Sequence, residues 1–288
     1  MKKVLVTGGA GSMGRLVTNN LISMGYFVKI FDLPSANFEG FNTSKSEIIK
    51  GDLNSIEDIS NSINDVDSVI HLAAILPPVA NIKIELANKV NVDGTKNLVK
   101  CIELSKLDIH LIFSSSVSIY GKNINNKIVD IQTKAEPDDN YALTKYLSEQ
   151  IVTDSKLNFT VLRISGVSIP IFQEPPSEWP FKSEQEIEFI HRDDVVDSLC
   201  NSVDNKEAYG EIFNISGGKS WQMLGEKYVK DYFDILEVDI EASNYQEQNG
   251  HFSWYDSSKS NRILKYQNKN YKKYLSEIED DLERIMGE

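Results

Sequence analysis

The amino-acid sequence predicts an α/β fold, a doubly wound parallel sheet with a small C-terminal part. Three observations lead to this prediction. Short runs rich in Val, Ile and Phe alternate with helical patterns over the first two-thirds of the chain. A glycine-rich turn follows the first of these runs directly. The chain has 288 residues, which suffices for one large α/β domain with a smaller addition.

The strands are predicted from runs whose apolar side chains occupy consecutive positions. This pattern is typical of parallel strands that are buried on both faces. The runs are Lys3–Thr7, Phe27–Phe31, Glu47–Ile49, Ser68–Leu72, Ile109–Ser114 and Phe159–Ile164. Helices are expected between them, at about 12–24, 55–63, 82–106 and 139–155. The polar run Asn123–Asn126 predicts a surface loop.

The pattern changes after Arg163, where four prolines between residues 169 and 180 indicate irregular chain. Beyond them we expect a helix near 192–203, a strand at 211–215, a helix at about 220–235 and a terminal helix near 270–286. We therefore assign residues 1–165 to the sheet domain, which a strand near 211–216 can rejoin. Residues 166–288 are expected to form a small, discontinuous substrate-binding cap.

The composition excludes several classes of protein. Hydrophobic residues make up 41% and charged residues 25%, as in ordinary soluble proteins. Asp and Glu total 43 against 30 Lys and Arg, a net charge of −13, so no nucleic-acid partner is expected, because such binding neutralises phosphates. No window approaches the roughly 20 apolar residues of a membrane helix. The N-terminal apolar run is too short for a signal peptide.

The two cysteines, Cys101 and Cys200, lie in predicted helices without a CxxC partner or a nearby His. We therefore expect no metal site and predict both side chains to be small buried hydrophobes. Such cysteine usage is typical of a reducing compartment, so a cytoplasmic location is expected.

The glycine-rich turn predicts a Rossmann-type dinucleotide site. Four glycines between residues 8 and 14 follow the first strand, open a helix, and fit both GxGxxG and GxxGxxG. Glycine permits the tight turn and lets a pyrophosphate approach the backbone, where the N–H groups at the helix N-terminus hold it. The cofactor residues expected from this turn are Gly8, Gly11, Ser12, Met13 and Gly14.

Acidic residues after the next two strands indicate which cofactor binds. Asp32 can accept both hydroxyls of the adenosine ribose and would repel a 2′-phosphate. Residues 33–38 contain no Lys or Arg to receive such a phosphate, so NAD rather than NADP is expected. Arg15 is interpreted as a solvated or phosphate-facing residue. Asp52 either reaches the adenine amino group or caps the helix that begins near Ser55.

Three polar residues form a candidate catalytic group. Ser116 follows the fifth strand, and Tyr141 and Lys145 come 25 and 29 positions later in a helical region. Residues at i and i+4 share one helix face, so the lysine ammonium can lower the pKa of the phenol. The tyrosine could then remove a proton from a secondary alcohol while hydride leaves to the cofactor, with the serine orienting the same oxygen.

Together these motifs resemble the extended short-chain dehydrogenase/reductase family, in its NAD-dependent epimerase/dehydratase group typified by UDP-glucose 4-epimerase. The resemblance covers nearly the whole chain and also rests on His71–Ala74, Asn91–Thr95, Leu162–Arg163, Ile190–Val195 and Phe213–Gly218. It implies that Ser116, Tyr141 and Lys145 are catalytic, with Tyr141 and Lys145 also at the cofactor. The further cofactor residues expected are Leu53, Leu72, Ala73, Ala74, Asn91 and Ser114. His191 and Asp194 are expected to link the domains rather than to catalyse.

Departures from the family pattern narrow the reaction. Family dehydratases carry an Asp-Glu pair where this chain has Val117 and Ser118, so dehydration is not expected. The segment after Arg163 lacks the family's asparagine, and only 28 positions separate Arg163 from His191. In nucleotide-sugar epimerases that stretch is longer and helps to hold the nucleoside diphosphate. The expected substrate contacts are Leu76, Pro77, Ser116, Ser118 and Gly166.

The main hypothesis is an NAD-dependent oxidoreductase or epimerase acting on a secondary alcohol of a sugar or nucleotide-sugar. An alternative is a net dehydrogenase or ketoreductase on a smaller sugar acid or hydroxy acid, which the short segment favours. A third is a non-catalytic NAD-sensing regulator, against which the Tyr/Lys pair argues. Family members often pair through two long helices, so the resemblance also implies a homodimer through the helices near 82–106 and 139–155.

Overall fold

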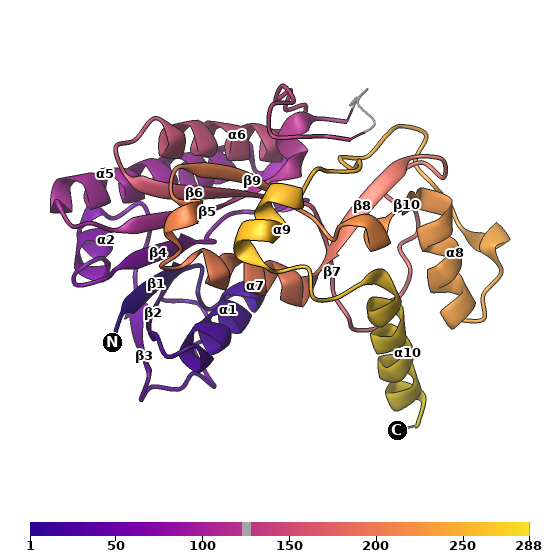
Figure 1. The fold of residues 1–288 in the computed structure, drawn as a ribbon, viewed down its shortest axis with the longest axis horizontal. Coiled ribbons are helices and arrows are strands. Elements are labelled where there is room, and N and C mark those ends of the chain that lie inside the picture. Colours follow the sequence, from indigo (N-terminus) through magenta and orange to yellow (C-terminus); the bar gives the residue numbers. More distant parts are fainter. Residues whose placement is uncertain (123–127, 288) are drawn as a thin grey trace.

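The computed structural model describes residues 1–122 and 128–287. The predicted loop Asn123–Asn126 lies outside these described residues. Within them, a large parallel sheet is covered by helices on both faces, and a smaller sheet lies beside it (Figure 1). The predicted α/β fold of the Rossmann type is therefore confirmed.

The large sheet runs in the order β3-β2-β1-β4-β5-β6-β9, and every neighbouring pair is parallel. The strand order reverses between β1 and β4, and ligands of such sheets bind outside the carboxyl ends of the strands at this point. The predicted strands agree with the observed ones to within one or two residues. The observed bounds are β1 (Lys3–Thr7), β2 (Phe27–Asp32), β3 (Ser46–Lys50), β4 (Ser68–His71), β5 (His110–Ser116), β6 (Asn158–Ile164) and β9 (Glu211–Ile215).

Two sets of helices cover the two faces of the large sheet. On one face α1 packs against α7 and α7 against α9, whereas on the other α2 packs against α5 and α5 against α6. Each face has its own buried aliphatic core, as the consecutive apolar residues of the strands require. The bounds are α1 (Ser12–Ser23), α2 (Ile56–Ser62), α5 (Gly94–Ser105), α6 (Asn140–Thr153), α7 (Arg192–Ser202) and α9 (Ser258–Leu264).

The helix predicted at about 82–106 is not continuous. It consists of α4 (Ile84–Ala87), a π-helical turn η1 (Asn88–Asp93) and α5, and a short helix α3 (Val79–Ile82) precedes it. Turns of the π type inside α-helices are frequent at functional sites, because they re-aim a side chain. Here the turn contains Asn91, which bonds to the loop after β4.

The C-terminal part contains a second sheet that the sequence pattern did not predict. It has the order β10-β8-β7, and helices α8 and α10 pack beside it around an aromatic core. Residues 222–224, expected as helix, instead pair with β8, and Met223 is buried between two more exposed neighbours. The bounds are β7 (Gly166–Ser168), β8 (Glu186–His191), β10 (Gln222–Leu224), α8 (Gly225–Ile235) and α10 (Tyr271–Gly287), with 3₁₀ turns η2 (Val117–Tyr120), η3 (Lys206–Ala208), η4 (Lys219–Trp221) and η5 (Ile240–Ala242).

The chain crosses between the two parts more than once. After β8 it returns to the large sheet, where α7 packs on α1 and β9 pairs with β6. It then forms β10 and α8, returns once more as α9, and ends in α10 (Figure 1). The division into domains at residues 165 and 166 remains a prediction.

Candidate active site

A cavity of about 310 Å³ lies at the carboxyl ends of β1, β2 and β3. We call it the cofactor cavity. It is placed at the switch point of the sheet, where the fold is expected to bind a ligand. Eleven of the predicted cofactor residues line it: Gly8, Gly11, Ser12, Met13, Gly14, Asp32, Asp52, Leu53, Leu72, Ala73 and Ala74.

The turn between β1 and α1 requires glycine at two positions. Gly8 has a φ of +68°, and a Cβ there would come within 2.8 Å of the Ala73 nitrogen. A Cβ on Gly14 would lie 2.4 Å from the Gly8 carbonyl oxygen. No side chain caps the N-terminus of α1, so its first N–H groups are left for a ligand. These features fit the pyrophosphate of a dinucleotide.

Asp32 and Arg15 agree with NAD rather than NADP. Asp32 accepts hydrogen bonds from the backbone nitrogens of Ala10 (3.0 Å) and Leu33 (2.8 Å), which hold its carboxylate in the wall of the cavity. The Arg15 guanidinium donates to the carbonyl oxygens of Ala10, Asn37 and Glu39. Its donors are thereby engaged by the backbone, so it is not placed to receive a 2′-phosphate.

The structure separates the two interpretations of Asp52. The helix cap is Ser55, whose Oγ accepts from the Asp58 nitrogen at 3.2 Å. Asp52 instead accepts from the backbone and side-chain nitrogens of Asn54 and lines the cofactor cavity. Its carboxylate therefore remains a candidate for the adenine amino group, and the capping interpretation is wrong.

The loop after β4 is held from behind by two buried residues. Asn91 accepts from the Ile75 nitrogen (2.7 Å) and donates to the Ile75 oxygen (3.1 Å) and to Thr144 Oγ1 (3.0 Å). Its amide is thus used to join this loop to α6, and it is not among the residues that line the cofactor cavity. His71 lies between Thr7 and Thr95, and burial lowers its pKa to about 3.

A second, smaller cavity of about 230 Å³ contains the three predicted catalytic residues, Ser116, Tyr141 and Lys145, together with Ser114. We call it the catalytic cavity. Its wall shares Met13, Leu72 and Leu76 with the cofactor cavity, so the two are adjacent. The end of β5 provides the serines and the first turns of α6 provide the tyrosine and lysine.

Tyr141 is held at the start of α6. Asp139 caps this helix by accepting from the Ala142 nitrogen (2.7 Å), and Asn81 accepts from the Tyr141 nitrogen (2.9 Å). Burial raises the pKa of the Tyr141 phenol to about 12, although its hydrogen bond with Ser116 acts in the opposite direction. The structure therefore does not show the expected lowering of this pKa, because desolvation of the phenolate dominates.

Lys145 lies one helical turn after Tyr141. Its ammonium donates to the Ser114 carbonyl oxygen (2.7 Å) and lies 5.2 Å from the centre of the Phe113 ring. Burial lowers its pKa to about 8. No carboxylate among the residues that line this cavity competes for the ammonium, so the charge is available to a ligand or to a phenolate.

A buried ion pair fixes α6 against β5 and β6. Arg163 donates to Glu149 through Nε (3.1 Å) and Nη2 (2.5 Å), and to the Tyr120 hydroxyl through Nη1 (2.8 Å). The second oxygen of Glu149 accepts from Ser115 Oγ (2.8 Å). Ser115 adjoins Ser116 and Glu149 lies one helical turn after Lys145, so the pair positions the catalytic group, although neither Arg163 nor Glu149 lines its cavity.

The predicted substrate residues divide into two groups. Leu76 and Ser116 line the catalytic cavity. Ser118 is buried and bonds to Ser116 Oγ, so it supports the serine. Gly166 is packed against Phe189, where a Cβ would come within 2.3 Å of the ring, and Pro77 lines none of the cavities described here. The substrate roles of all five remain predictions.

His191 and Asp194 lie outside both cavities and join the two parts of the molecule. His191 Nε2 is 2.8 Å from Glu277 Oε2 on α10, and its Nδ1 accepts from the Asp193 nitrogen. Asp194 accepts from the backbone nitrogens of Asn268 and Lys269. These contacts agree with a linking role.

Some residues of the two cavities escaped the sequence analysis. Val90 lines the cofactor cavity, and Val195, Leu199 and Val167 line the catalytic one. Val195 and Leu199 are four residues apart, so the sequence predicts that they share one face of a helix. It does not predict which part of the protein that face packs against. Only the return of α7 onto α1 brings them to the site.

The structure also bears on the expectations about cysteines, metal ions and membrane helices. Cys101 and Cys200 are buried and unbridged. Among residues 1–122 and 128–287, no group of three His, Cys, Asp or Glu side chains could hold a metal ion. No helix in the described part of the chain combines the length and apolarity needed to cross a bilayer. A cytoplasmic location stays a prediction.

The fold and this pair of cavities define a dinucleotide-binding protein with a polar group beside its cofactor site. Residues 4–178 match the model of the NAD dependent epimerase/dehydratase family, and the chain belongs to that family. The family is NAD-dependent, and NAD is accordingly the cofactor of this chain.

The relatives of known name differ in the reaction they catalyse. Sterol-4-alpha-carboxylate 3-dehydrogenase, decarboxylating, from Bos taurus is 34% identical over 175 residues, 59% of this chain and 48% of that protein. D-erythronate dehydrogenase from Cupriavidus necator is 27% identical over 183 residues, 58% of this chain and 55% of that one. A putative UDP-glucose 4-epimerase from Methanocaldococcus jannaschii is 29% identical over 266 residues, 82% of each chain. The chain thus matches about half the length of the sterol dehydrogenase.

Solved structures share the fold over nearly the entire chain. A short-chain dehydrogenase/reductase superfamily protein from Agrobacterium tumefaciens with bound NAD has a TM-score of 0.83 at 19% identity, covering 99% of this chain and 98% of that one. UDP-glucose 4-epimerase from Thermotoga maritima with UDP-glucose has a TM-score of 0.82 at 22% identity, covering 99% of both. At these identities the likeness shows the fold alone.

Proposed function

We propose that this protein oxidises a secondary alcohol, or reduces the corresponding ketone, with Tyr141 transferring the proton. One observation carries the proposal: Ser116, Tyr141 and Lys145 lie in one cavity whose wall is shared with the cofactor cavity. A substrate in the smaller cavity therefore lies next to a cofactor in the larger one. NAD, when bound, is the group that takes up or gives the hydride.

In this proposal, residues of the chain donate and accept the proton. Burial favours the protonated form of the Tyr141 phenol, which is the form that donates a proton to a ketone oxygen during reduction. Oxidation requires the phenolate, which the Lys145 ammonium stabilises electrostatically in this desolvated place. Ser116 bonds to Tyr141 and is placed to orient the same substrate oxygen. The alcohol loses this proton and one hydride and becomes a ketone.

Substitution of Tyr141 by phenylalanine tests the proposal, because it removes one oxygen and keeps the ring. We expect turnover of any secondary-alcohol substrate to fall by at least about a hundredfold, the usual contribution of general acid–base catalysis. NAD binding, measured by calorimetry, should change little. Unchanged turnover would show that Tyr141 is not the proton-transfer residue.

Epimerisation is the second candidate, since the putative epimerase relative matches most of the chain. An epimerase returns the hydride to the same substrate, so epimers interconvert without net formation of NADH. A dehydrogenase accumulates NADH in proportion to the product. Following NADH absorbance and the product configuration in one reaction distinguishes the two.

We also propose a homodimer through the predicted helices near 82–106 and 139–155. The outer surfaces of α4 and α6 expose apolar side chains, among them Leu86, Leu143 and Leu147. Clustered exposed apolar side chains are typical of an interface. The oligomeric state in solution tests this proposal.

A further inference from the structure

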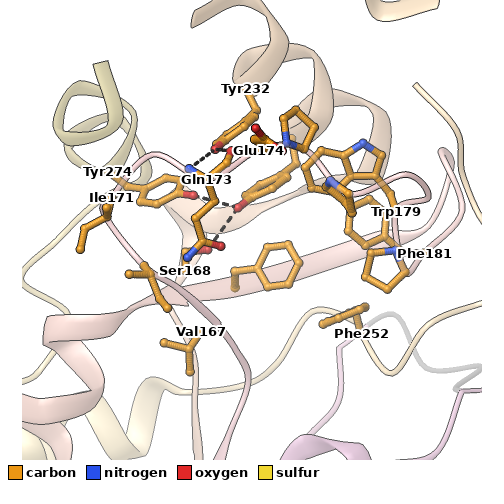
Figure 2. A pocket seen from close by; sticks show the side chains of 16 residues that line it. Val167, Ser168, Ile171, Gln173, Glu174, Trp179, Phe181, Tyr232, Phe252 and Tyr274 are labelled. Carbon is orange, nitrogen blue, oxygen red and sulfur yellow. Dashed lines mark hydrogen bonds between the residues drawn. The ribbon is translucent and has the colours of Figure 1, made fainter. Parts of the chain in front are cut away.

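A third cavity, of about 370 Å³, lies in the C-terminal part between the small sheet, α8, α10 and the proline-rich segment (Figure 2). We call it the aromatic cavity, because seven of the residues that line it are aromatic: Trp179, Phe181, Phe189, Tyr228, Tyr232, Phe252 and Tyr274. Its volume falls in the range of small-molecule sites. Neither the catalytic group nor the cofactor residues line it.

The aromatic rings of this wall pack against one another as one rigid surface. The Phe189 and Tyr228 ring centres are 4.9 Å apart, and those of Phe189 and Phe252 are 5.0 Å apart. Trp179 meets Tyr228 edge-on at 6.0 Å. Rings held in this way offer faces and edges to a ligand without the entropy loss of ordering flexible side chains.

The tyrosine hydroxyls of the wall are hydrogen-bonded within it, whereas the buried Trp179 Nε1 has no hydrogen-bond partner among the described residues. The Tyr228 hydroxyl lies 3.3 Å from Ser168 Oγ and 3.1 Å from the Tyr274 hydroxyl. The Tyr232 hydroxyl donates to the Gln173 carbonyl oxygen at 2.6 Å, as the dashed lines of Figure 2 show. What the wall presents to a ligand is therefore mainly carbon.

The charge of the cavity is unsuited to an anion. Among the described residues that line it, Glu174 is the only charged one, and none is Lys, Arg or His. The chain as a whole carries a net charge of −13. A diphosphate needs cationic or N–H donors at close range, and a carboxylate beside it is repulsive.

Aliphatic side chains connect this cavity to the catalytic one. Val167, Ile169 and Ile171 alternate along the segment that leaves β7, line the aromatic cavity, and are all exposed. Val167 also lines the catalytic cavity beside Tyr141. Exposed aliphatic residues gathered at one opening mark a surface that a ligand covers.

We infer that the aromatic cavity binds an uncharged, apolar ring system of the substrate whose alcohol reacts at Tyr141. The inference rests on the proposed function and adds to it the substrate class. The family match ends at residue 178, and all of the aromatic residues that line the cavity lie beyond it, so the rings belong to the part of the chain that the family model does not match. A nucleoside diphosphate, the competing ligand, finds no cation in this wall.

The test measures binding and turnover by the full chain saturated with NAD. The probes are three neutral alcohols of increasing ring number (cyclohexanol, decalinol and a 3β-hydroxysteroid), with UDP-glucose and UDP-galactose as competitors. We expect kcat/KM and affinity by calorimetry to rise by roughly tenfold or more with each added ring, because each buries further apolar surface. The nucleotide sugars should bind more weakly than the steroid.

A matched pair of variants locates the binding. Ile171 and Val238 are exposed to nearly the same extent, 45% and 44%, and only the first lines the cavity. Ile171→Asp should raise KM for the steroid by about tenfold or more with little change in kcat, whereas Val238→Asp should leave both unchanged. Equal increases in KM for the two variants would show that the substrate does not bind in the aromatic cavity.

The outcomes separate this inference from the proposed function. Tighter binding of a nucleotide sugar than of every neutral alcohol, or no binding of any of the three alcohols, overturns the inference. If Tyr141→Phe still abolishes turnover in that case, the proposed function stands. If Tyr141→Phe leaves turnover intact, the proposed function fails, and calorimetry with the Ile171 variant still tests the cavity.

Discussion

Ser115 Oγ donates a 2.8 Å hydrogen bond to Glu149 Oε2 in the interior of the protein. Ser115 is the neighbour of Ser116, and Glu149 lies one helical turn after Lys145. This contact therefore sets the distance between the strand and the helix that together carry the catalytic group. The other carboxylate oxygen of Glu149 is paired with Arg163.

Glu149→Leu is expected to lower the free energy of unfolding by about 3–5 kcal/mol, because it leaves the buried Arg163 charge uncompensated. Urea denaturation measures the change, and Glu226→Leu, at an exposed site on α8, serves as the control. Adding Arg163→Leu to the first variant should restore part of the loss, since no buried charge then remains. If the change in unfolding free energy of the double variant equals the sum of the two single changes, Glu149 and Arg163 are not coupled.

Lys145→Met should reduce turnover by at least about a hundredfold and also weaken NAD binding, since Lys145 lines the catalytic cavity, which adjoins the cofactor cavity. Lys145→Arg should not restore activity, because the larger planar guanidinium does not fit the bond to the Ser114 carbonyl. Steady-state kinetics and calorimetry measure both effects. Lys100→Met, at an exposed position on α5, is the matched control.

Asp32→Asn should shift the ratio of NAD to NADP affinity toward NADP by roughly tenfold or more. The amide oxygen can still accept from the Ala10 nitrogen, although the bond from the Leu33 nitrogen is lost, and the charge that repels a 2′-phosphate is removed. Asp52→Asn, in the same cavity, should leave the ratio unchanged. Equal shifts in the two variants would mean that Asp32 does not face the ribose.

His71 is expected to make stability depend on pH. Burial lowers its pKa from 6.5 to about 3, so between these values the unfolded chain binds a proton that the folded protein does not. Stability should therefore fall as the pH falls through this window, by up to about 1.4 kcal/mol per pH unit. His110, with a pKa lowered to about 4, contributes in the same direction.

The contribution of His71 is isolated by comparing urea midpoints of the wild type and His71→Gln at pH 7 and pH 4. The variant can keep a bond to Thr7 or Thr95 but does not titrate. Its stability should change less between the two pH values. An identical pH dependence would mean that His71 is already charged in the folded protein or accessible to protons.

Leu143→Lys together with Leu147→Lys should convert the proposed dimer to a monomer. Both side chains are exposed on α6, so the substitutions should change the stability of the folded chain little. In a dimer, the two lysines would face the same two lysines of the other copy, and like charges would repel. Light scattering at micromolar concentration gives the mass, with Val238→Lys as the control. A wild-type protein that is monomeric under these conditions contradicts the proposal.

Much of the large sheet and of the cofactor site could be predicted because their signals are local. A buried parallel strand is apolar at consecutive positions, and a dinucleotide turn needs glycine for reasons that the turn itself contains. Tyr141 and Lys145 were found together because the helix period alone places them on one face. The role of Asn91 depended on Ile75 and Thr144, which are distant in sequence, and local spacing did not specify those partners.

The sequence by itself determined the parallel sheet, the NAD site and the identity of the catalytic candidates, because these follow from periodicity, glycine and residue chemistry. Only the tertiary structure decided the small sheet, since β10 is three residues long and is stabilised by pairing with β8 rather than by its own propensity. It also decided the pKa of Tyr141, because burial is set by what packs around the ring. Only the tertiary structure forms the aromatic cavity, because its rings come from four separate stretches of chain that packing brings together.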